Sequence, residues 1–346
     1  MASQKPTIDD VARLAGVGRA TVSRVVNNGP FVRQELRDRV MEAVEQLGFR
    51  INLQARNLAA GASREVALIL SSDLDSEPNS YYSSGLELGA MRGCSEHGFR
   101  LSNHNVSQNA PDAEERIVGS VEEGRYRAII LTPPFSDDVH LIERLHRCGC
   151  SVVCISAGSQ ARQIASSVGM DDEAAGYDLT RYLIGLGHRS FGFILGIEGH
   201  LSAEERYQGF LRALAEAEID GTAVPVERGN FTFHSGIACA QRILDRADPP
   251  TALICANDDT AAGAMLTAHK MGLDIPAEIS IVGFDDTPVS EIIWPPLTTV
   301  HQPIKEMGRR AVELSLEAAG DGAAERRVEI IPHHIAVRES AAPPRR

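Results

Sequence analysis

Residues 7–27 read TIDDVARLAGVGRATVSRVVN, and this stretch decides the fold of the amino-terminal end. Thr7 followed three positions later by Asp10 is a variant of the capping box that starts a helix. Apolar residues follow at helical spacing up to Gly16, which permits a tight turn because it tolerates left-handed backbone angles. A second short helix is expected over 19–27. The pattern predicts two helices joined by a short turn that contains glycine.

A third helix is predicted over 34–47, where an apolar stripe recurs at helical spacing and ends before Gly48. Two short helices packed by a third form the helix-turn-helix pattern, in which the second helix lies in the major groove of DNA. Arginine there can bond a guanine edge through two donors, and Ser or Asn can hold phosphate. A helical bundle with a solvated basic face is the alternative. The outward residues are Arg19, Ala20, Ser23, Arg24 and Asn27.

Charge is unevenly distributed along the chain. The 346 residues carry a formal net charge of -13, which by itself argues against binding to nucleic acid. Residues 1–61, however, hold nine Lys and Arg against six acidic residues, so this head carries +3 and the remainder -16. A basic head on an acidic body indicates that only the head meets phosphates.

Composition excludes several classes of protein. Hydrophobic residues make up 43% and charged residues 23%, as in ordinary globular proteins. No apolar run approaches the roughly 18 residues that span a bilayer, and the first residues do not resemble a signal peptide. We therefore expect a cytoplasmic protein with no membrane partner. The six cysteines form no C-x-x-C pair, so we expect buried thiols, no metal site and no cofactor.

Residues 52–60 read NLQARNLAA and are followed by Gly61. The composition favours a helix, but isolated helices shorter than about 12 residues are marginal in water. We expect this segment to be unstructured alone and to fold on DNA. A plain linker is the alternative.

Beyond residue 64 the chain alternates short apolar runs with amphipathic segments. Buried strands that alternate with helices predict parallel sheets, and the number of units predicts two lobes. The expected strands are 66–70, 128–131, 152–155, 191–195, 252–255 and 279–282. The expected helices include 81–97, 172–186, 203–218 and 260–271. The predicted fold class is α/β, with two doubly wound parallel sheets behind the helical head.

Polar residues recur where these strands end, and ligands of parallel sheets bind beyond the carboxyl ends of the strands. A cleft rich in Asp, Asn, Ser and Arg with an aromatic floor suits a neutral polyol. Each hydroxyl can donate and accept, and the apolar face of a sugar ring stacks on an aromatic side chain. Any one of these residues is more often a turn or helix-cap residue, so only the constellation predicts a site. Its members are Ser71, Ser72, Thr132, Ser156, Asn257, Asp258, Asp285 and Asp286.

Four stretches of the head carry a resemblance to a known family. Residues 8–17, 21–27 and 37–49 read IDDVARLAGV, TVSRVVN and RDRVMEAVEQLGF. They resemble the DNA-binding head of the lac repressor family of sugar-responsive regulators, and residues 52–60 resemble its hinge helix. Ile51 stands where that family usually has Pro.

The family resemblance implies roles for individual positions of the head. The positions that match Arg19 and Ala20 choose bases, and the position that matches Arg24 also reads the operator. The position that matches Leu58 wedges into the minor groove and kinks the DNA. The implied DNA-contacting set is Thr7, Arg19, Ala20, Thr21, Ser23, Arg24, Asn27, Asn52, Ala55 and Leu58.

The body resembles the same family. The motifs LGHRSFGF, RYQGF, AND, VGFDDT and PLTTV begin at residues 186, 206, 256, 282 and 296. By position, Arg206, Asn257 and Asp285 correspond to residues that bond effector hydroxyls, and Phe231 to an aromatic that stacks on the ring. Ser156 occupies a site where Asp is frequent. The implied effector-binding set is Ser71, Tyr82, Thr132, Ser156, Arg206, Phe231, Asn257 and Asp285. Trp294 is expected to pack in the protein rather than bind ligand.

The resemblance also implies a domain organisation in which the chain crosses between two lobes near 166, 298 and 331. The tail has no leucine heptads, so we expect a homodimer. The expected bounds are 1–50 for the helix-turn-helix domain, 51–62 for the hinge, 63–166 with 299–331 for the first lobe, 167–298 with 332–340 for the second lobe, and 341–346 for a flexible tail.

The sequence thus predicts a sequence-specific regulator of transcription, by family expectation a repressor of a carbohydrate operon. Its expected partners are near-palindromic double-stranded operator DNA and a small sugar-like effector. A purine- or nucleoside-responsive regulator is the alternative. A solute-binding transport protein would share the body but would need a signal peptide and has no use for residues 1–61. No enzyme activity is expected, since nucleotide-binding and hydrolase motifs do not occur in the required contexts.

Overall fold

The computed structural model describes residues 7–26, 32–47, 64–71, 81–122, 126, 128–318 and 325–345. The chain divides into two compact units, Met1–Ala62 and Ser63–Arg346. Each unit has its own hydrophobic core. None of the helices in the described ranges combines the length and the apolar character that crossing a bilayer requires.

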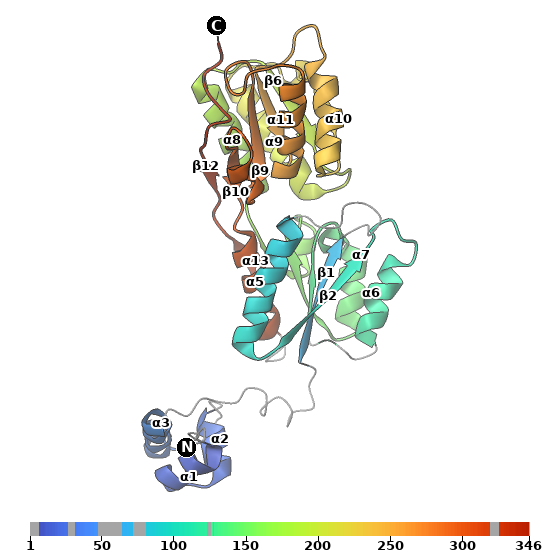
Figure 1. The fold of residues 1–346 in the computed structure, drawn as a ribbon. Coiled ribbons are helices and arrows are strands. Elements are labelled where there is room, and N and C mark those ends of the chain that lie inside the picture. The colour runs from blue at the N-terminus through green and yellow to red at the C-terminus, as the bar shows by residue number, and fades with distance from the viewer. Residues whose placement is uncertain are drawn as a thin grey trace. The chain divides into compact units, whose positions relative to one another are not determined.

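Helices α1 (Ile8–Ala15), α2 (Arg19–Val26) and α3 (Gln34–Leu47) build the described part of the first unit (Figure 1). They confirm the predicted helices. Helix α1 begins with the predicted capping box, because the Thr7 hydroxyl accepts from the Asp10 amide at 3.3 Å and the Asp10 carboxylate accepts from the Thr7 amide at 2.9 Å. The buried side chains of this unit are Val11, Ala15, Val22, Val25, Val40 and Ala43.

The turn between α1 and α2 requires glycine for two reasons. Gly16 has φ 63°, in the left-handed region that side chains disfavour. A Cβ there would also lie 2.8 Å from the guanidinium of Arg39. Arg39, on α3, donates to the Ala15 carbonyl at 2.5 Å and so ties the end of α1 to the third helix.

In the described residues the second unit holds two six-stranded sheets. The first is parallel throughout, in the order β11-β5-β4-β3-β1-β2. Its strands are β1 (Glu65–Ser71), β2 (Arg100–Val106), β3 (Ala128–Leu131), β4 (Ser151–Ile155), β5 (Ser166–Gly169) and β11 (Val328–Ile330). Figure 1 shows α5 (Tyr81–His97) and α13 (Ile304–Ala318) on one face and α6 (Ala113–Glu122) and α7 (Val139–Arg147) on the other, each pair over its own apolar cluster.

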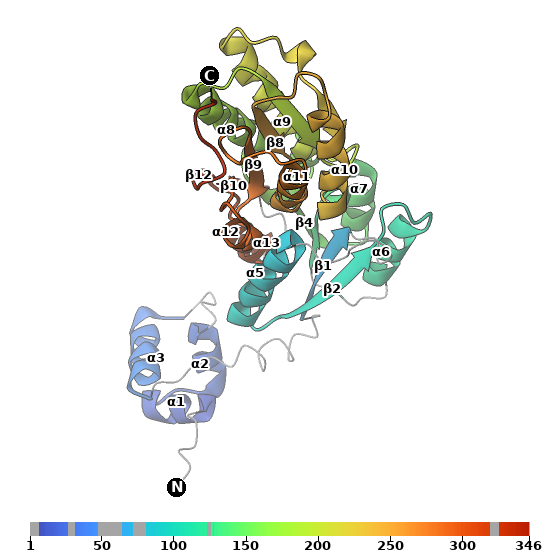
Figure 2. The same ribbon diagram turned by 45° about the horizontal axis from the view of Figure 1, so that its top comes forward.

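The second sheet has the order β12-β10-β9-β8-β6-β7 and is parallel except for β12, which runs antiparallel to β10. Its strands are β6 (Phe191–Leu195), β7 (Val226–Arg228), β8 (Ala252–Cys255), β9 (Ser280–Asp285), β10 (Thr298–His301) and β12 (His334–Ala336). Helices α8 (Asp172–Leu186) and α9 (Leu201–Glu216) cover one face, and α10 (Phe233–Leu244) and α11 (Asp258–Lys270) the other (Figure 2). The short helix α12 (Val289–Ile292) follows β9.

The neighbouring helices on these faces approach closely through glycine. A Cβ on Gly209 of α9 would lie 2.0 Å from the Glu173 carbonyl oxygen on α8. In return, a Cβ on Gly176 of α8 would lie 2.1 Å from the Arg206 carbonyl oxygen on α9. Glycine thus sets the spacing of this helix pair, and Gly89 with Gly308 and Gly236 with Gly263 do the same for α5 with α13 and α10 with α11.

The first two crossings between the lobes come later than predicted. Strand β5 continues to Gly169 in the first sheet, three residues past the expected lobe bound at 166. Strand β10 continues to His301 in the second sheet, three residues past the expected lobe bound at 298. Backbone pairing with β4 and β9 extends both strands past the residues at which the apolar pattern fades. The third crossing lies between Ile331 and His334.

The prediction of a flexible tail over 341–346 is wrong for the described residues up to 345. The Ala342 amide donates to the Ser280 hydroxyl at 3.1 Å, and the Ala342 carbonyl lies 3.0 Å from His188 Nε2. Beyond it, Pro344 lies within 4.0 Å of a Cβ built on Gly187. The tail is therefore fixed to the second lobe by backbone bonds that its composition does not reveal.

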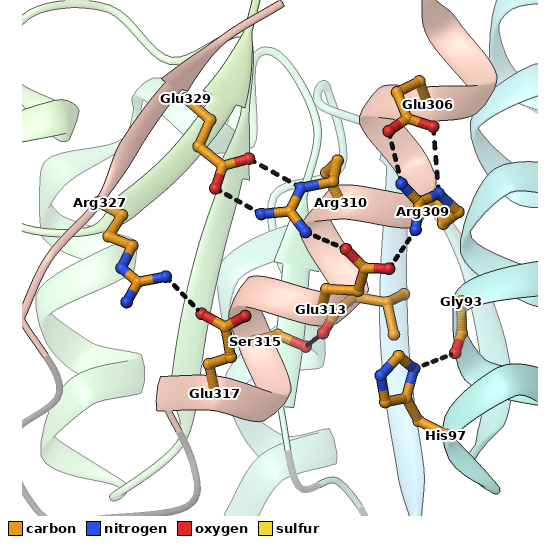
Figure 3. A network of polar contacts seen from close by, with 11 residues as sticks. Gly93, His97, Glu306, Arg309, Arg310, Glu313, Ser315, Glu317, Arg327 and Glu329 are labelled. Atoms are coloured by element: carbon orange, nitrogen blue, oxygen red, sulfur yellow. Dashed lines mark hydrogen bonds and ion pairs between the residues drawn. The ribbon is translucent and has the colours of Figure 1, made fainter.

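A charged network fastens the edge strand β11 to the first lobe (Figure 3). Arg310 on α13 donates to both carboxylate oxygens of Glu329 on β11, at 2.9 and 2.6 Å. Glu313 accepts from both Arg310 and Arg309, and Arg309 also bonds Glu306 at 2.6 Å. Bidentate guanidinium–carboxylate pairs are geometrically specific, so this network orients the strand that leads into the third crossing.

Candidate functional site

The outward side of α2 is the candidate DNA-contacting surface. Its inward valines are buried in the core of the head, while Arg19, Ala20 and Arg24 are exposed and Thr21 is half-buried. The Arg19 guanidinium lies 3.7 Å from the Asp9 carboxylate, but both side chains are largely exposed. Exposed pairs of this kind contribute little, so the pairing does not prevent Arg19 from reaching a DNA base.

The structure says less about the other predicted DNA-contacting residues. Thr7 is exposed, although its hydroxyl already bonds Asp10 in the capping box. Ser23 lies on α2. The remaining predicted contacts, Asn27, Asn52, Ala55 and Leu58, lie outside the described residues.

A cavity of about 540 Å³ in the second unit is lined by residues of both lobes. This volume is within the range of about 300–1,000 Å³ that is usual for small-molecule sites. The cavity brings together all eight residues of the predicted effector set. The first lobe contributes Ser71, Tyr82, Thr132 and Ser156, and the second lobe contributes Arg206, Phe231, Asn257 and Asp285.

Many of the lining residues share one position in the fold, the carboxyl ends of strands. Ser71 ends β1, and Thr132 and Ser156 directly follow β3 and β4. In the second sheet, Asn257 follows β8 and Asp285 ends β9. Both sheets therefore direct their carboxyl ends to the same cavity, which is where doubly wound folds bind ligands.

Arg206 is the only cation among the described lining residues, and it is only 5% exposed. Its Nε donates to the Asp172 carboxylate at 2.8 Å, and its Nη1 donates to the Ala256 carbonyl at 2.9 Å. Nη1 also lies 4.0 Å from the Asp285 carboxylate, and Nη2 donates to Gln302 Oε1 at 3.3 Å. The positive charge of Arg206 is therefore compensated within the protein, as a buried charge requires.

Three buried polar groups of the cavity lack such partners. The Asp285 side chain is 7% exposed and, apart from its approach to Arg206, makes no hydrogen bond to a described residue. Burial raises the pKa of Asp285, and Arg206 opposes that rise. Burial also lowers the pKa of His200 to about 4, so its ring is neutral at pH 7. His200 Nδ1 and Ser156 Oγ have no hydrogen-bond partner in the described part of the chain, and such groups are costly unless a ligand or water satisfies them.

Phe231 supplies an aromatic surface that its neighbours hold in place. A Cβ on Gly196 would lie 2.1 Å from the ring, so the ring packs directly on backbone. The His200 ring contacts it edge-on, with centroids 4.9 Å apart and planes at 65°. Asn257 Nδ2 donates to the Phe231 carbonyl at 2.9 Å. The geometry suits stacking of a flat apolar face on a fixed ring.

Backbone strain is concentrated at this cavity. Ser156, Phe231 and Asp285 have φ angles of 49°, 65° and 106°, in the left-handed region. Such conformations cost free energy in residues other than glycine and cluster at binding sites, where the surrounding structure enforces them. The strain is a signal of function that is independent of the residue types.

Two predicted residues also use their side chains within the protein. Asn257 caps α11 by accepting from the Thr260 amide at 3.0 Å, in addition to its bond to Phe231. Thr132 Oγ1 donates to the Ile69 carbonyl at 2.9 Å. Both line the cavity, but they have less hydrogen-bonding capacity left for a ligand than Asp285 has.

Comparison with known proteins matches both units of the chain. The family described as bacterial regulatory proteins of the lacI family matches residues 7–52, and the periplasmic binding protein-like domain matches residues 180–341. The HTH-type transcriptional repressor PurR of Vibrio vulnificus is 30% identical over 96% of this chain and 98% of its own length. The chain belongs to the lacI family. Its relatives are regulators of transcription rather than enzymes.

Solved structures of lacI-family proteins share this fold. A complex of the transcriptional regulator CelR with cellobiose has a TM-score of 0.74 and 30% identity, and the match covers 97% of this chain and 99% of that one. A lac repressor dimer bound to operator and the anti-inducer ONPF also has a TM-score of 0.74, with 27% identity over 98% of this chain and 100% of that one. These likenesses confirm the predicted architecture of a helical head and a two-lobed body.

The cavity of this lacI-family chain also contains residues that sequence reasoning missed. They come from strand ends that the apolar pattern does not predict or from loops beyond them. Gln302 follows β10, and His200 lies in the loop between β6 and α9. Ser107, Gln108 and Asn109 follow β2. The rule that ligands lie at strand ends would find Gln302, Ser107, Gln108 and Asn109 if β10 and β2 were recognised.

Trp294 is more exposed than its predicted packing role requires. It is expected to pack, yet it is 76% exposed, and Ile292 two residues earlier is 75% exposed. Neither residue lines the cavity. The cis peptide bond between Trp294 and Pro295 lies in the same loop. An apolar pair that is so exposed is unusual on a protein surface unless another molecule covers it.

Proposed function

We propose that this chain is a repressor that binds near-palindromic operator DNA as a homodimer and responds to an uncharged saccharide in the cavity between its lobes. The observation that carries the proposal is the compensated charge of Arg206 beside the Asp285 side chain, which makes no hydrogen bond to a described residue. Saccharide binding would satisfy the buried polar groups, shift one lobe against the other and alter operator affinity. Such coupling between two sites typically contributes about 1–3 kcal/mol.

The DNA-binding part of the proposal rests on α2. Its exposed arginines can reach the major groove while its valines anchor it in the head. We expect the Arg24→Ala variant to lose about 1–3 kcal/mol of operator affinity. Its loss of affinity for random DNA should be no larger than the loss shown by a charge-matched control variant. The operator would be selected by the wild-type protein from a random DNA library, and affinities would be measured by fluorescence anisotropy.

Arg13→Ala is the matched control for Arg24→Ala. Removal of Arg13 changes the net charge of the head by the same amount. Arg13 lies on α1, its side chain is 79% exposed, and among the described residues it pairs only with Asp10, at 3.3 Å. Equal losses on selected and random DNA for Arg24→Ala would contradict the placement of α2 in the groove.

The charge of the cavity supports an uncharged effector. The one lining cation in the described residues, Arg206, is paired with Asp172, and Asp285 adds a second acidic side chain beside it. An anionic ligand would therefore find no uncompensated positive charge in the described lining of the cavity. It would also be placed close to acidic side chains, which weakens its binding. Hydroxyl groups, by contrast, can donate to Asp285 and exchange hydrogen bonds with Ser156 and the neutral His200 ring.

We expect neutral sugars to bind and their acidic counterparts to bind at least about tenfold more weakly, a difference of about 1.4 kcal/mol. Calorimetric titration would compare cellobiose and glucose with glucuronate and glucose 6-phosphate, with and without operator. Guanine and adenosine would test the purine alternative. Tighter binding of an acid or a phosphate would overturn the neutral assignment, and binding of a purine alone would replace the saccharide.

The homodimer is supported by exposed apolar side chains. Ile292 and Trp294 present large apolar surfaces that a second copy could cover. A symmetric dimer would place two heads on two half-sites of the operator, about 34–36 Å apart. Sedimentation of the full chain measures the oligomeric state directly.

A further inference from the structure

Asp286 lies between the cavity and the crossings of the chain. It directly follows the cavity residue Asp285 but does not line the cavity itself. Its Oδ2 accepts from His301 Nδ1 at 2.8 Å, and its Oδ1 accepts from Arg338 Nη2 at 2.6 Å. Burial would raise the pKa of Asp286, but the hydrogen bonds from Arg338 and His301 outweigh it and lower the pKa. Ser290 Oγ also donates to Asp286 Oδ1, at 3.3 Å, so the ionised Asp286 carboxylate has three hydrogen-bond partners among the described residues.

Two partners of Asp286, His301 and Arg338, belong to the segments that connect the lobes. His301 is the last residue of β10, and only Gln302 and Pro303 separate it from α13 in the first lobe. His301 is paired in the sheet with His334, the first residue of β12, and their rings stack with centroids 4.5 Å apart. The Asp286 carboxylate therefore bonds His301 at the second crossing directly. It is connected to the third crossing through the stacked rings of His301 and His334.

Arg338, which lies two residues beyond the end of β12, extends the same connection. Its Nη1 donates to the Leu297 carbonyl at 3.0 Å, and its amide donates to the Thr298 hydroxyl at 2.9 Å. These bonds join the segment that follows β12 to the start of β10. The segments that enter and leave the second lobe are consequently held to each other and to Asp286.

Asp285 and Asp286 share an unusual backbone conformation. Their φ angles are 106° and 57°, so two consecutive residues occupy the left-handed region. Few neighbouring conformations are available to such a pair. We therefore expect a displacement of Asp285 by a bound ligand to reach Asp286 through the backbone.

We propose that Asp286 is a positioning residue that couples ligand occupancy at Asp285 to the inter-lobe crossings at 301–303 and 331–334. This role rests on the proposed function, since it assigns a route by which the cavity alters the arrangement of the lobes. Asp286 needs no contact with the ligand. Its side chain acts through His301 and Arg338.

Asp258 provides a matched control. Asp258 is a fully buried carboxylate beside this turn, whereas Asp286 is half-buried. Asp258 accepts from the Thr287 amide at 2.7 Å and the Thr299 hydroxyl at 2.6 Å. Thr287 and Thr299 both lie within the second lobe, and neither is a partner of Asp286. Asp258→Asn should disturb the local structure without affecting the crossings.

The first arm of the test is hydrogen–deuterium exchange of the full chain without ligand. Asp286→Asn should exchange at least about fivefold faster than the wild type in peptides that cover 301–306 and 331–336, because the anchor of both segments is weakened. Asp258→Asn should leave those peptides unchanged. Wild-type exchange rates in Asp286→Asn would overturn the proposal, and Arg338→Lys supplies a second variant if the first does not fold.

The second arm measures coupling with the saccharide panel of cellobiose, glucose, maltose and ribose. In Asp286→Asn the best binder should keep its affinity within about threefold of the wild-type value, while its effect on operator affinity falls to less than about twofold. An intact response would overturn the proposal, as would a loss of saccharide affinity equal to that of Asp285→Ala. A wild-type protein that responds to no saccharide would instead refute the proposed function.

Discussion

Replacing Asp285 by alanine is expected to weaken saccharide binding at least about 100-fold and to abolish the response of operator binding. A buried polar group that loses its hydrogen-bond partner costs about 1–3 kcal/mol, and the Asp285 carboxyl group can bond more than one hydroxyl of a ligand. It is buried in the cavity wall and has no hydrogen bond to a described residue that would compete with a ligand hydroxyl. Titration calorimetry and operator binding with and without saccharide would measure both effects.

The variant should still fold and bind operator. Arg206 keeps its bond to Asp172 at 2.8 Å, so no buried cation is left unpaired by the change. The DNA-contacting helix belongs to the other compact unit. Operator affinity without saccharide is therefore expected to stay within about twofold of the wild-type value. The corresponding change in binding free energy is smaller than the contribution of one hydrogen bond. A normal saccharide response in this variant would remove Asp285 from the site.

Replacing Gly209 by alanine is expected to destabilise the second unit by about 3 kcal/mol, the upper end of the range for overpacked cores. The new Cβ would lie 2.0 Å from the Glu173 carbonyl oxygen and 2.6 Å from the Tyr177 amide nitrogen. Both atoms are helix backbone and cannot rotate away, so α8 and α9 must separate. The separation would also stretch the ion pair between Arg206 on α9 and Asp172 on α8.

Thermal unfolding should show this effect as a decrease of about 6–12 °C in the melting temperature. Gly185→Ala on α8 is the matched control, because the residue is exposed and no atom of its surroundings lies within 4 Å of the position that a new Cβ would take. That change should stabilise the helix by about 0.5–1 kcal/mol, since alanine loses less backbone entropy than glycine. An unchanged melting temperature for Gly209→Ala would show that the helices can yield at little cost.

Much of the fold follows from sequence pattern where burial is complete. The predicted strands 128–131, 191–195 and 252–255 coincide with β3, β6 and β8, because every residue of these strands is buried and reads as an apolar run. Strand β2 escapes prediction. It lies at the edge of its sheet, and most of its residues are at least partly exposed, so polar side chains interrupt the pattern.

The site can be predicted only as far as it depends on strand ends. Ser71 and Asp285 are identified because they end strands that the apolar pattern reveals. His200 cannot be identified in this way, since its burial and lowered pKa arise from packing against Phe231 and from nearby Arg206. The partners of Arg206 depend on tertiary structure in the same way, because Asp172 and Gln302 are distant from it in sequence.

Neither lobe can complete its fold until the ribosome has synthesised residues 328–342. The first sheet is incomplete without β11 at 328–330, and the second is incomplete without β12 and the hydrogen bonds of Ala342. Until then β5 and β10 are unpaired edges, the kind of surface that associates wrongly and that chaperones shield. The core of the head, by contrast, draws its contacts from residues 11–47 alone. A nascent chain therefore has a folded head long before it has a closed cavity.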